Sequence, residues 1–155
     1  MKKYAKLSKC RNYRFSLSRM WDNSQPHVMF ICLNPSTADE TEDDPTIRCC
    51  INYAKLWGYG GLYIGNLFAF RATEPKDMLA ATNPIGDNND KWLLKLSSEA
   101  ALVVAAWGNA GKHMGRSQQV RQLIPNLYCL KINKSGEPAH PLYQKTNLKP
   151  VPICI

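Results

Sequence analysis

Asn34, Asn66 and His140 have side chains suited to chemistry, and each stands at or near the end of an apolar run. An amide supplies both a donor and an acceptor, so it can orient a water molecule or read the edge of a base. A histidine titrates near neutrality and can donate a proton or stabilise a developing anion. These three residues are the first candidates for a functional site.

Polar residues directly after the first run extend this candidate site. Pro35 prevents a strand from continuing past Asn34, because proline has no N–H group for the ladder. Ser36 and Thr37 offer hydroxyls to a phosphate, and Asp39 is the carboxylate nearest the strand end, a candidate general base. Two alternatives stay open: Asn34 only closes a local turn, and the acidic residues form a solvated loop.

The next two loops add candidate binding residues. Asn66 interrupts an apolar run, and a buried amide costs about 1–3 kcal/mol if it is left unsatisfied. It therefore pairs with Asn34, reads a base edge, or is a satisfied core amide. Arg71 is placed to hold a phosphate, with a surface salt bridge as the alternative. Gly108 allows close approach of the backbone to a ligand, and Trp107 is either a stacking surface or part of the core.

The last loop holds the sequence His140-Pro141-Leu142-Tyr143. We include Pro141 and Tyr143 among the candidate substrate contacts and expect His140 to be the acid–base group. The other two histidines, His27 and His113, are typical of surface or capping positions.

The elements that must position these residues alternate between strand and helix. Residues 27–33, 62–68, 101–107 and 126–132 are apolar runs typical of strands buried on both faces. Helices are expected after Asp44-Pro45, over 75–81 and 87–98, and over 111–124. This alternation predicts one α/β domain over residues 1–155, with a mainly parallel four-stranded core sheet and helices on both faces. All four loops would then leave the same edge of the sheet, where open α/β sheets bind ligands.

The ends of the domain are less regular. Residues 1–12 read as a basic N-terminal arm, and 134–155 as an irregular proline-rich tail that contains the His-Pro loop. Residues 13–21 alternate in part, which predicts an edge strand or a lead-in segment.

The charge balance favours a phosphate-bearing partner. The 155 residues include 20 Lys and Arg against 12 Asp and Glu, a formal net charge of +8. Neutralising phosphates releases counterions, so nucleic acid or nucleotide is the expected partner; a merely basic protein is the alternative. Seven basic residues crowd the start: Lys2, Lys3, Lys6, Lys9, Arg11, Arg14 and Arg19.

The cysteine pattern and the hydropathy indicate the cellular compartment and which cofactors to expect. Six cysteines occur without a CxxC pair, so neither zinc nor iron–sulfur spacing is present, and we expect no metal and no cofactor. No P-loop lysine–serine pair is present. No run reaches the length of a membrane span. Free thiols in a reducing cytoplasm are therefore expected.

Several motifs together resemble an uncharacterised family of bacterial and phage proteins, a domain of unknown function (DUF1643-like). The resemblance covers nearly the whole chain from about Tyr13. The motifs are Leu33-Asn34-Pro35-Ser36-Thr37-Ala38-Asp39, Asp44-Pro45-Thr46-Ile47-Arg48, Trp57-Gly58-Tyr59-Gly60-Gly61, Asn66-Leu67-Phe68-Ala69-Phe70-Arg71-Ala72-Thr73, Asn89-Asp90, Ala106-Trp107-Gly108 and His140-Pro141-Leu142-Tyr143.

More distantly, the arrangement is similar to the uracil-DNA glycosylase superfamily. Asn34-Pro35 matches the Asn-Pro step of its mismatch-specific members, and His140-Pro141 matches the His-Pro step whose histidine faces the base carbonyl. The resemblance implies a three-layer α/β/α sandwich with core strands in the order 2-1-3-4. Ser36-Thr37 stand where those enzymes usually have glycine and an aromatic residue, and Leu142 where a serine is common, which argues against uracil as the base.

The expected function is hydrolysis of an N-glycosidic bond to an unusual or modified base. Asn34 would hold the attacking water, with Asp39 as base, and His140 would stabilise the departing base; Asn66 would read the base and Arg71 hold phosphate. One alternative is a non-catalytic module that binds a nucleotide or nucleic acid. A weaker one is a metal-dependent phosphoester hydrolase built on the acidic loop.

Overall fold

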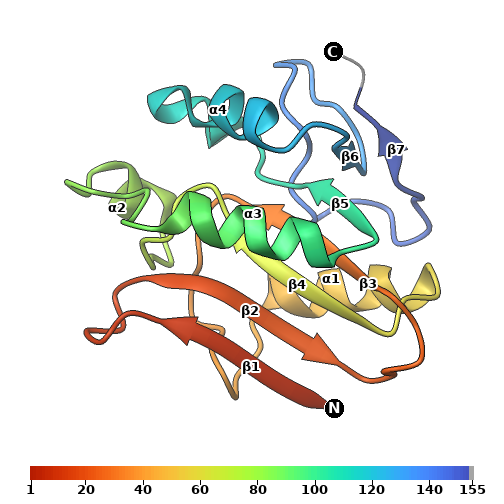
Figure 1. Ribbon diagram of the computed structural model, residues 1–155. Helices are drawn as coiled ribbons and strands as arrows, with labels where there is room; N and C mark the ends of the chain where they lie inside the picture. Colours follow the sequence, from red (N-terminus) through yellow and green to blue (C-terminus); the bar gives the residue numbers. More distant parts are fainter. Residues whose placement is uncertain (154–155) are drawn as a thin grey trace.

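The chain folds around one seven-stranded sheet. The structure is a computed structural model and describes residues 1–153. In Figure 1 the strands lie in the order β1-β2-β4-β3-β5-β6-β7. The strands are β1 (Lys2–Leu7), β2 (Arg14–Met20), β3 (His27–Cys32), β4 (Gly61–Asn66), β5 (Leu102–Ala105), β6 (Tyr128–Cys129) and β7 (Val151–Pro152). The helices are α1 (Pro45–Leu56), α2 (Pro75–Leu79), α3 (Asn89–Glu99), the 3₁₀ helix η1 (Asn109–Gly115) and α4 (Arg116–Leu123).

The α/β class is confirmed, but the sheet is larger than four strands and it is mixed. Strand β3 pairs in parallel with both β4 and β5, and β5 pairs in parallel with β6. The strands β1 and β2 add to one side in antiparallel orientation, and β7 adds to the other. The parallel strands place their carboxyl ends, and the loops that follow, at one edge of the sheet.

Both faces of the sheet are covered, which explains the continuous apolar run of β3. Successive side chains of a strand point to opposite faces. Val28 and Phe30 therefore pack in the cluster formed with α1, and Met29 and Ile31 in the cluster formed with α3 and α4. Figure 1 shows α3 and α1 on opposite sides of the sheet.

The N-terminal segment is part of the sheet and not a free arm. Residues Lys2–Leu7 form β1, the edge strand, which pairs with β2 from Lys2 opposite Met20 to Leu7 opposite Arg14. An edge strand rich in lysine is well suited to that position, because the charges oppose pairing with another chain. The segment 13–21 does contain a strand, β2, but it lies inside the sheet and not at its edge.

The helix expected over 111–124 is broken in two. Met114 and Gly115 both have positive φ, 57° and 64°, so the 3₁₀ helix η1 ends there and α4 starts afresh at Arg116. The tail is mostly irregular as expected, although β7 pairs with β6 near its end.

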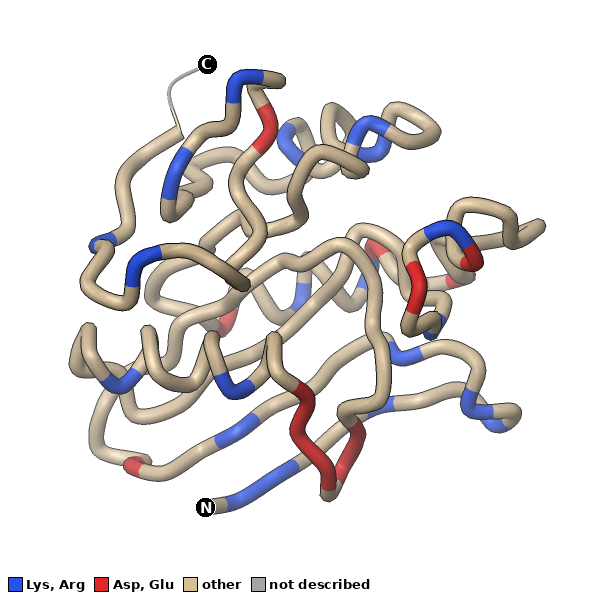
Figure 2. Tube along the Cα trace, turned by 180° about the vertical axis from the view of Figure 1, so that it is seen from behind, with Lys and Arg blue, Asp and Glu red and all other residues tan. Residues whose placement is uncertain are grey.

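Basic residues near the N-terminus neutralise the acidic loop at residues 39–44. The fully buried Arg19 donates from Nε to Asp43 Oδ1 at 2.7 Å and from Nη2 to the carbonyls of Asp39 and Glu42. Lys3 also contacts Asp43, and Arg11 contacts Glu40 at 2.8 Å. Figure 2 shows the acidic segment beside the basic N-terminal strands. Part of the positive charge is therefore used inside the fold.

Candidate functional site

A small cavity lies at the carboxyl ends of β3 and β4. It is bounded by the first turn of α1 and by the loop that follows β6. Five residues singled out in the sequence meet here: Asn34, Pro35, Ser36, Asn66 and His140. The remaining lining residues are Arg14, Cys32, Asp44, Thr46, Ile47 and Ile64.

Asn34 lines the cavity with its side-chain nitrogen already engaged. Its Nδ2 donates to the carbonyls of Pro35, at 3.0 Å, and Ala72, at 2.9 Å. Two carbonyl acceptors fix which end of the amide is nitrogen. Within residues 1–153 its Oδ1 has no partner. Asn34 therefore offers an acceptor, which is what orientation of a water molecule requires.

His140 is held as a neutral donor. Its Nδ1 accepts a hydrogen bond from the backbone N–H of Leu142 at 3.2 Å, so the neutral ring has its proton on Nε2. Burial lowers the pKa of His140 below its ordinary value of 6.5, against the opposing charge of Asp44. At neutral pH the ring is uncharged, and among residues 1–153 its Nε2–H has no acceptor.

Side chains of α1 and a glycine position the His140 loop. The backbone of the tail crosses α1 and accepts hydrogen bonds from three residues spaced four apart, two on that helix and one at its C-cap. These pairs are Cys49 with Pro141 at 3.4 Å, Tyr53 with Lys145 at 2.6 Å and Trp57 with Leu148 at 2.9 Å. On the other side lies Gly108, where an added Cβ would stand 3.5 Å from that of His140. Gly108 also has φ +75°, which favours glycine.

Arg14 lines the cavity, although in the sequence it stands out only as one of the basic residues near the start. Its guanidinium is buried and donates to the carbonyl of Ala38 at 3.0 Å and to Asn66 Oδ1 at 3.3 Å. Burial lowers the pKa of Arg14 to about 10, against the opposing charge of Asp44, so the group stays charged at neutral pH. Because Oδ1 of Asn66 is held by Arg14, its Nδ2 is the atom that Asn66 can offer to a ligand.

Asp44 accepts two backbone hydrogen bonds, and the sequence indicated only the one that caps α1. The predicted helix start is confirmed, since Asp44 Oδ1 accepts from the N–H of Ile47 at 3.0 Å and Pro45 opens α1. Its Oδ2 also accepts from the N–H of Ala38 at 3.3 Å. Asp44 is thus the carboxylate that lines the cavity.

Asp39, Thr37 and Arg71 lie outside this cavity. Asp39 Oδ1 accepts from the N–H groups of Glu42, at 2.8 Å, and Thr41, at 2.9 Å, and these bonds lower the pKa of its carboxyl. A carboxylate so stabilised is a weak base. Arg71 donates to the carbonyls of Ser36, Thr37 and Arg11 and so clamps the loop that follows β3.

Two aromatic candidates have opposite environments. Trp107 is 1% exposed, packs in the core and donates from Nε1 to Glu137 Oε1 at 3.4 Å, so its ring has no free face for stacking. Tyr143 is fully exposed and has φ +68°, beyond the rim of the cavity. Pro141 packs near α1, where its carbonyl accepts from Cys49.

Metal ligands do not gather in the described part of the chain. Among residues 1–153, no three His, Cys, Asp or Glu side chains are placed to hold a metal ion. Cys10, Cys32, Cys49, Cys50 and Cys129 are free thiols; Cys154 lies outside the described residues. None of the described helices is long and apolar enough to cross a membrane.

Comparison with known proteins gives one match. A family model described as "Protein of unknown function (DUF1643)" matches residues 14–142. No curated protein and no solved structure matches the chain. The matched span includes Arg14, Asn34, Asn66 and His140, so the cavity lies within the part of the chain that defines the family.

Proposed function

We propose a function from the cavity itself, because the chain belongs to the DUF1643 family, whose description assigns no activity. In this proposal the protein is a hydrolase that cleaves the N-glycosidic bond of a nucleotide with an unusual or modified base, in the manner of the uracil-DNA glycosylase superfamily. The observation that supports it is the pairing, in one cavity, of a free amide oxygen on Asn34 with a neutral His140 that has Nε2–H free.

The chemistry assigns one role to each polar group. Asn34 Oδ1 accepts a hydrogen bond from water and directs its oxygen to the anomeric carbon. As the bond from that carbon to the base nitrogen breaks, its electron pair moves onto the base. His140 Nε2–H donates to the base where this negative charge grows, and Asn66 Nδ2 donates to a base acceptor. The water oxygen forms the new bond, and its proton leaves to solvent or to the released base.

The leaving group decides how much help the reaction needs. An amide does not take up a proton as a carboxylate does, so Asn34 positions water without deprotonating it. Stabilisation of the departing base therefore falls mainly to His140. A single preorganised donor of this kind is worth about 2.7–4 kcal/mol of transition-state stabilisation. This need for a good leaving group favours a base that readily bears negative charge.

The cavity must open before a base enters. Its volume is about 40 Å³, which is room for water, since one molecule needs about 10–15 Å³ by the same measure, but not for a base. Arg71 clamps Ser36 and Thr37 on one side. One of the walls must move to admit a base, since glycosylases in general extrude the base into a pocket.

The test is activity on single- and double-stranded oligonucleotides that contain a panel of modified bases. Released base is measured by chromatography, and abasic sites by alkali cleavage. Asn34→Ala and His140→Ala should each reduce turnover about a hundredfold or more. Asn52→Ala, on the exposed face of α1, and His113→Ala are the matched controls and should turn over as the parent does.

Other outcomes support the alternatives. Binding of an oligonucleotide or nucleotide without base release indicates a binding module. Cleavage of the phosphodiester that a chelator abolishes indicates a metal-dependent phosphoester hydrolase. If Asn34→Ala and His140→Ala lose only stability, with turnover retained, both residues are structural and the glycosidic proposal fails.

A further inference from the structure

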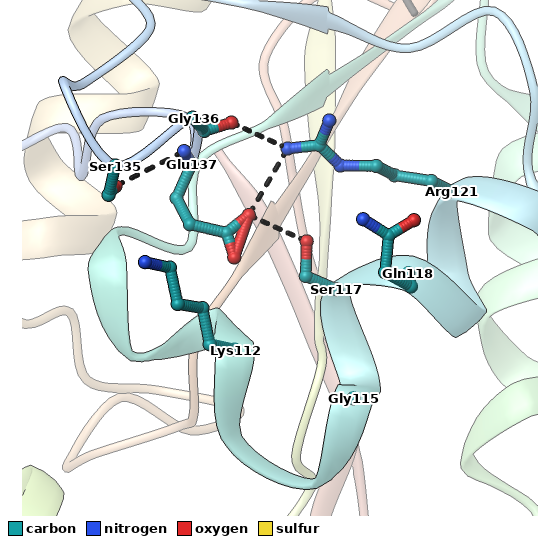
Figure 3. A pocket seen from close by; sticks show the side chains of 8 residues that line it. All are labelled: Lys112, Gly115, Ser117, Gln118, Arg121, Ser135, Gly136 and Glu137. Atoms are coloured by element: carbon teal, nitrogen blue, oxygen red, sulfur yellow. Dashed lines mark hydrogen bonds and ion pairs between the residues drawn. The ribbon is translucent and has the colours of Figure 1, made fainter.

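A second cavity lies where the helix expected over 111–124 is broken. It has a volume of about 360 Å³ and lies between η1, the first turn of α4 and the loop that follows β6 (Figure 3). Its lining consists of Lys112, Gly115, Ser117, Gln118, Arg121, Ser135, Gly136 and Glu137. None of these residues lines the cavity of Asn34 and His140.

The floor of this cavity is a buried carboxylate with one oxygen in use. Glu137 is only 4% exposed, yet its Oε1 accepts three hydrogen bonds: from Ser117 Oγ at 2.6 Å, Arg121 Nη2 at 3.1 Å and Trp107 Nε1 at 3.4 Å. Over residues 1–153, Oε2 has no partner. A carboxylate is an acceptor on both oxygens, so Oε2 is suited to a ligand that donates a hydrogen bond.

The rim of the cavity is positive. Figure 3 shows the side chains of Lys112 and Gln118 on opposite sides of the Glu137 carboxylate. Both are exposed, and in the described part of the chain neither makes a hydrogen bond from its side chain. Arg121 is engaged with Glu137 and with the carbonyl of Gly136. Lys112 and Arg121 against Glu137 leave one net positive charge, which favours an anionic ligand.

The backbone favours the same ligand. Helix α4 begins after Gly115, which has φ +64° and provides no side chain to cap the first turn. An added Cβ at Gly115 would meet nothing within 4 Å, so the approach to this turn is open. N–H groups in the first turn of a helix lack partners within that helix and attract anions, phosphate in particular. In α4 the N–H of Arg116 is already used, since it donates to the carbonyls of Gly111 and His113.

We propose that this cavity binds a sugar phosphate: a sugar hydroxyl donates to Glu137 Oε2, and the phosphate lies between Lys112 and the first turn of α4. Each part of this ligand has a matching group in the cavity. The sugar hydroxyl meets the acceptor at the floor, and the phosphate meets the positive rim. The volume lies within the range of about 300–1,000 Å³ that is usual for small-molecule sites. The same chemistry occurs in a free sugar phosphate and in a nucleotide, and the test separates the two sources.

Calorimetric titration of the full chain with ribose 5-phosphate is the first measurement, with inorganic phosphate, ribose and adenosine 5′-monophosphate as comparison ligands. Ribose 5-phosphate should bind more tightly than inorganic phosphate or ribose. Lys112→Ala should weaken binding of both phosphate ligands about tenfold, whereas Lys91→Ala, an exposed lysine on α3, should not. The nucleotide binds more tightly than the sugar phosphate if the base also contacts the protein.

Glu137→Gln tests the floor of the cavity. It should weaken ribose 5-phosphate about tenfold or more, the loss expected for one hydrogen bond to a charged group. Inorganic phosphate should bind no more weakly, because the change also removes a negative charge from the cavity. Because Glu137 is buried, circular dichroism must first show that this variant is folded; if it is not, the comparison of Lys112→Ala with Lys91→Ala decides the question. Asn34→Ala and His140→Ala should bind ribose 5-phosphate as the parent does, so failure here and failure of the glycosidic proposal are distinguishable. No binding of ribose 5-phosphate at millimolar concentration, or equal losses for Lys112→Ala and Lys91→Ala, would overturn the proposal.

Discussion

Arg19 should be one of the strongest single contributors to stability among the charged residues near the N-terminus. Its side chain is 0% exposed, and it pairs with Asp43 at 2.7 Å. Its Nη2 also donates to the carbonyls of Asp39, at 2.6 Å, and Glu42, at 3.0 Å. Arg19→Ala removes all of these donors at once and leaves the acceptors of the acidic loop without them.

The size of the effect follows from burial. Removing one partner of a buried ion pair costs about 3–5 kcal/mol. Asp43 keeps Lys3 and is 18% exposed, but Arg19→Ala also leaves the carbonyls of Asp39 and Glu42 without this donor. For a domain of this length, 1 kcal/mol corresponds to about 2–4 °C in Tm. We therefore expect Arg19→Ala to lower Tm by about 6–20 °C. Lys3→Ala should cost only about 0–1 kcal/mol, since Lys3 contacts the same Asp43 at 3.4 Å from a side chain that is 32% exposed.

Urea unfolding followed by circular dichroism measures the free energy of unfolding of both variants. Burial raises the pKa of Asp43, but the hydrogen bond and charge of Arg19 outweigh it and leave that pKa below its ordinary value of 3.8. The pair therefore stabilises the fold at higher pH, and this contribution is lost as pH falls below about 3.8 through the folded pKa. The difference in free energy of unfolding between the parent and Arg19→Ala should therefore become smaller at that low pH. Equal free energies of unfolding for Arg19→Ala and Lys3→Ala at pH 7 would refute the reasoning.

Two further outcomes concern His140 and the N-terminal lysines. Since burial lowers the pKa of His140, the unfolded chain takes up a proton more readily, so the free energy of unfolding should fall as pH drops below about 6.5. His140→Gln should flatten that part of the pH profile; an unchanged profile would mean that the ring is solvated. If the chain binds nucleic acid, neutralising Lys6 and Lys9 should reduce the slope of log K against log salt by about one unit per lost phosphate contact. Arg11→Gln should change it less, because Arg11 already pairs with Glu40, and an unaffected slope in the lysine variants would leave these charges as a solubility feature.

Local sequence patterns were sufficient to predict the elements that bury apolar surface. The strand β3 and the start of α1 at Asp44-Pro45 follow from composition and from capping chemistry within a few residues. The same local patterns placed Asn34 just after a buried strand, whereas His140 stands eleven residues after β6 and reaches the same cavity only through the fold. The break in the helix at Met114 and Gly115 was not predicted, because methionine and glycine there are compatible with either a helix or a turn.

Partnerships between distant residues were decided only by the tertiary structure. Arg14 and Arg19 count in the sequence only among the basic residues that crowd its start, and both are buried because acceptors from elsewhere in the chain surround them. Glu137 reads as a loop residue, and its burial depends on Ser117 and Arg121. A charged side chain is buried only where partners replace the water it loses, and those partners are brought in by the packing of other elements. The sequence by itself therefore determined the α/β class and the loops at which polar residues gather, while the fold decided which of those residues share a cavity and which charges are held inside.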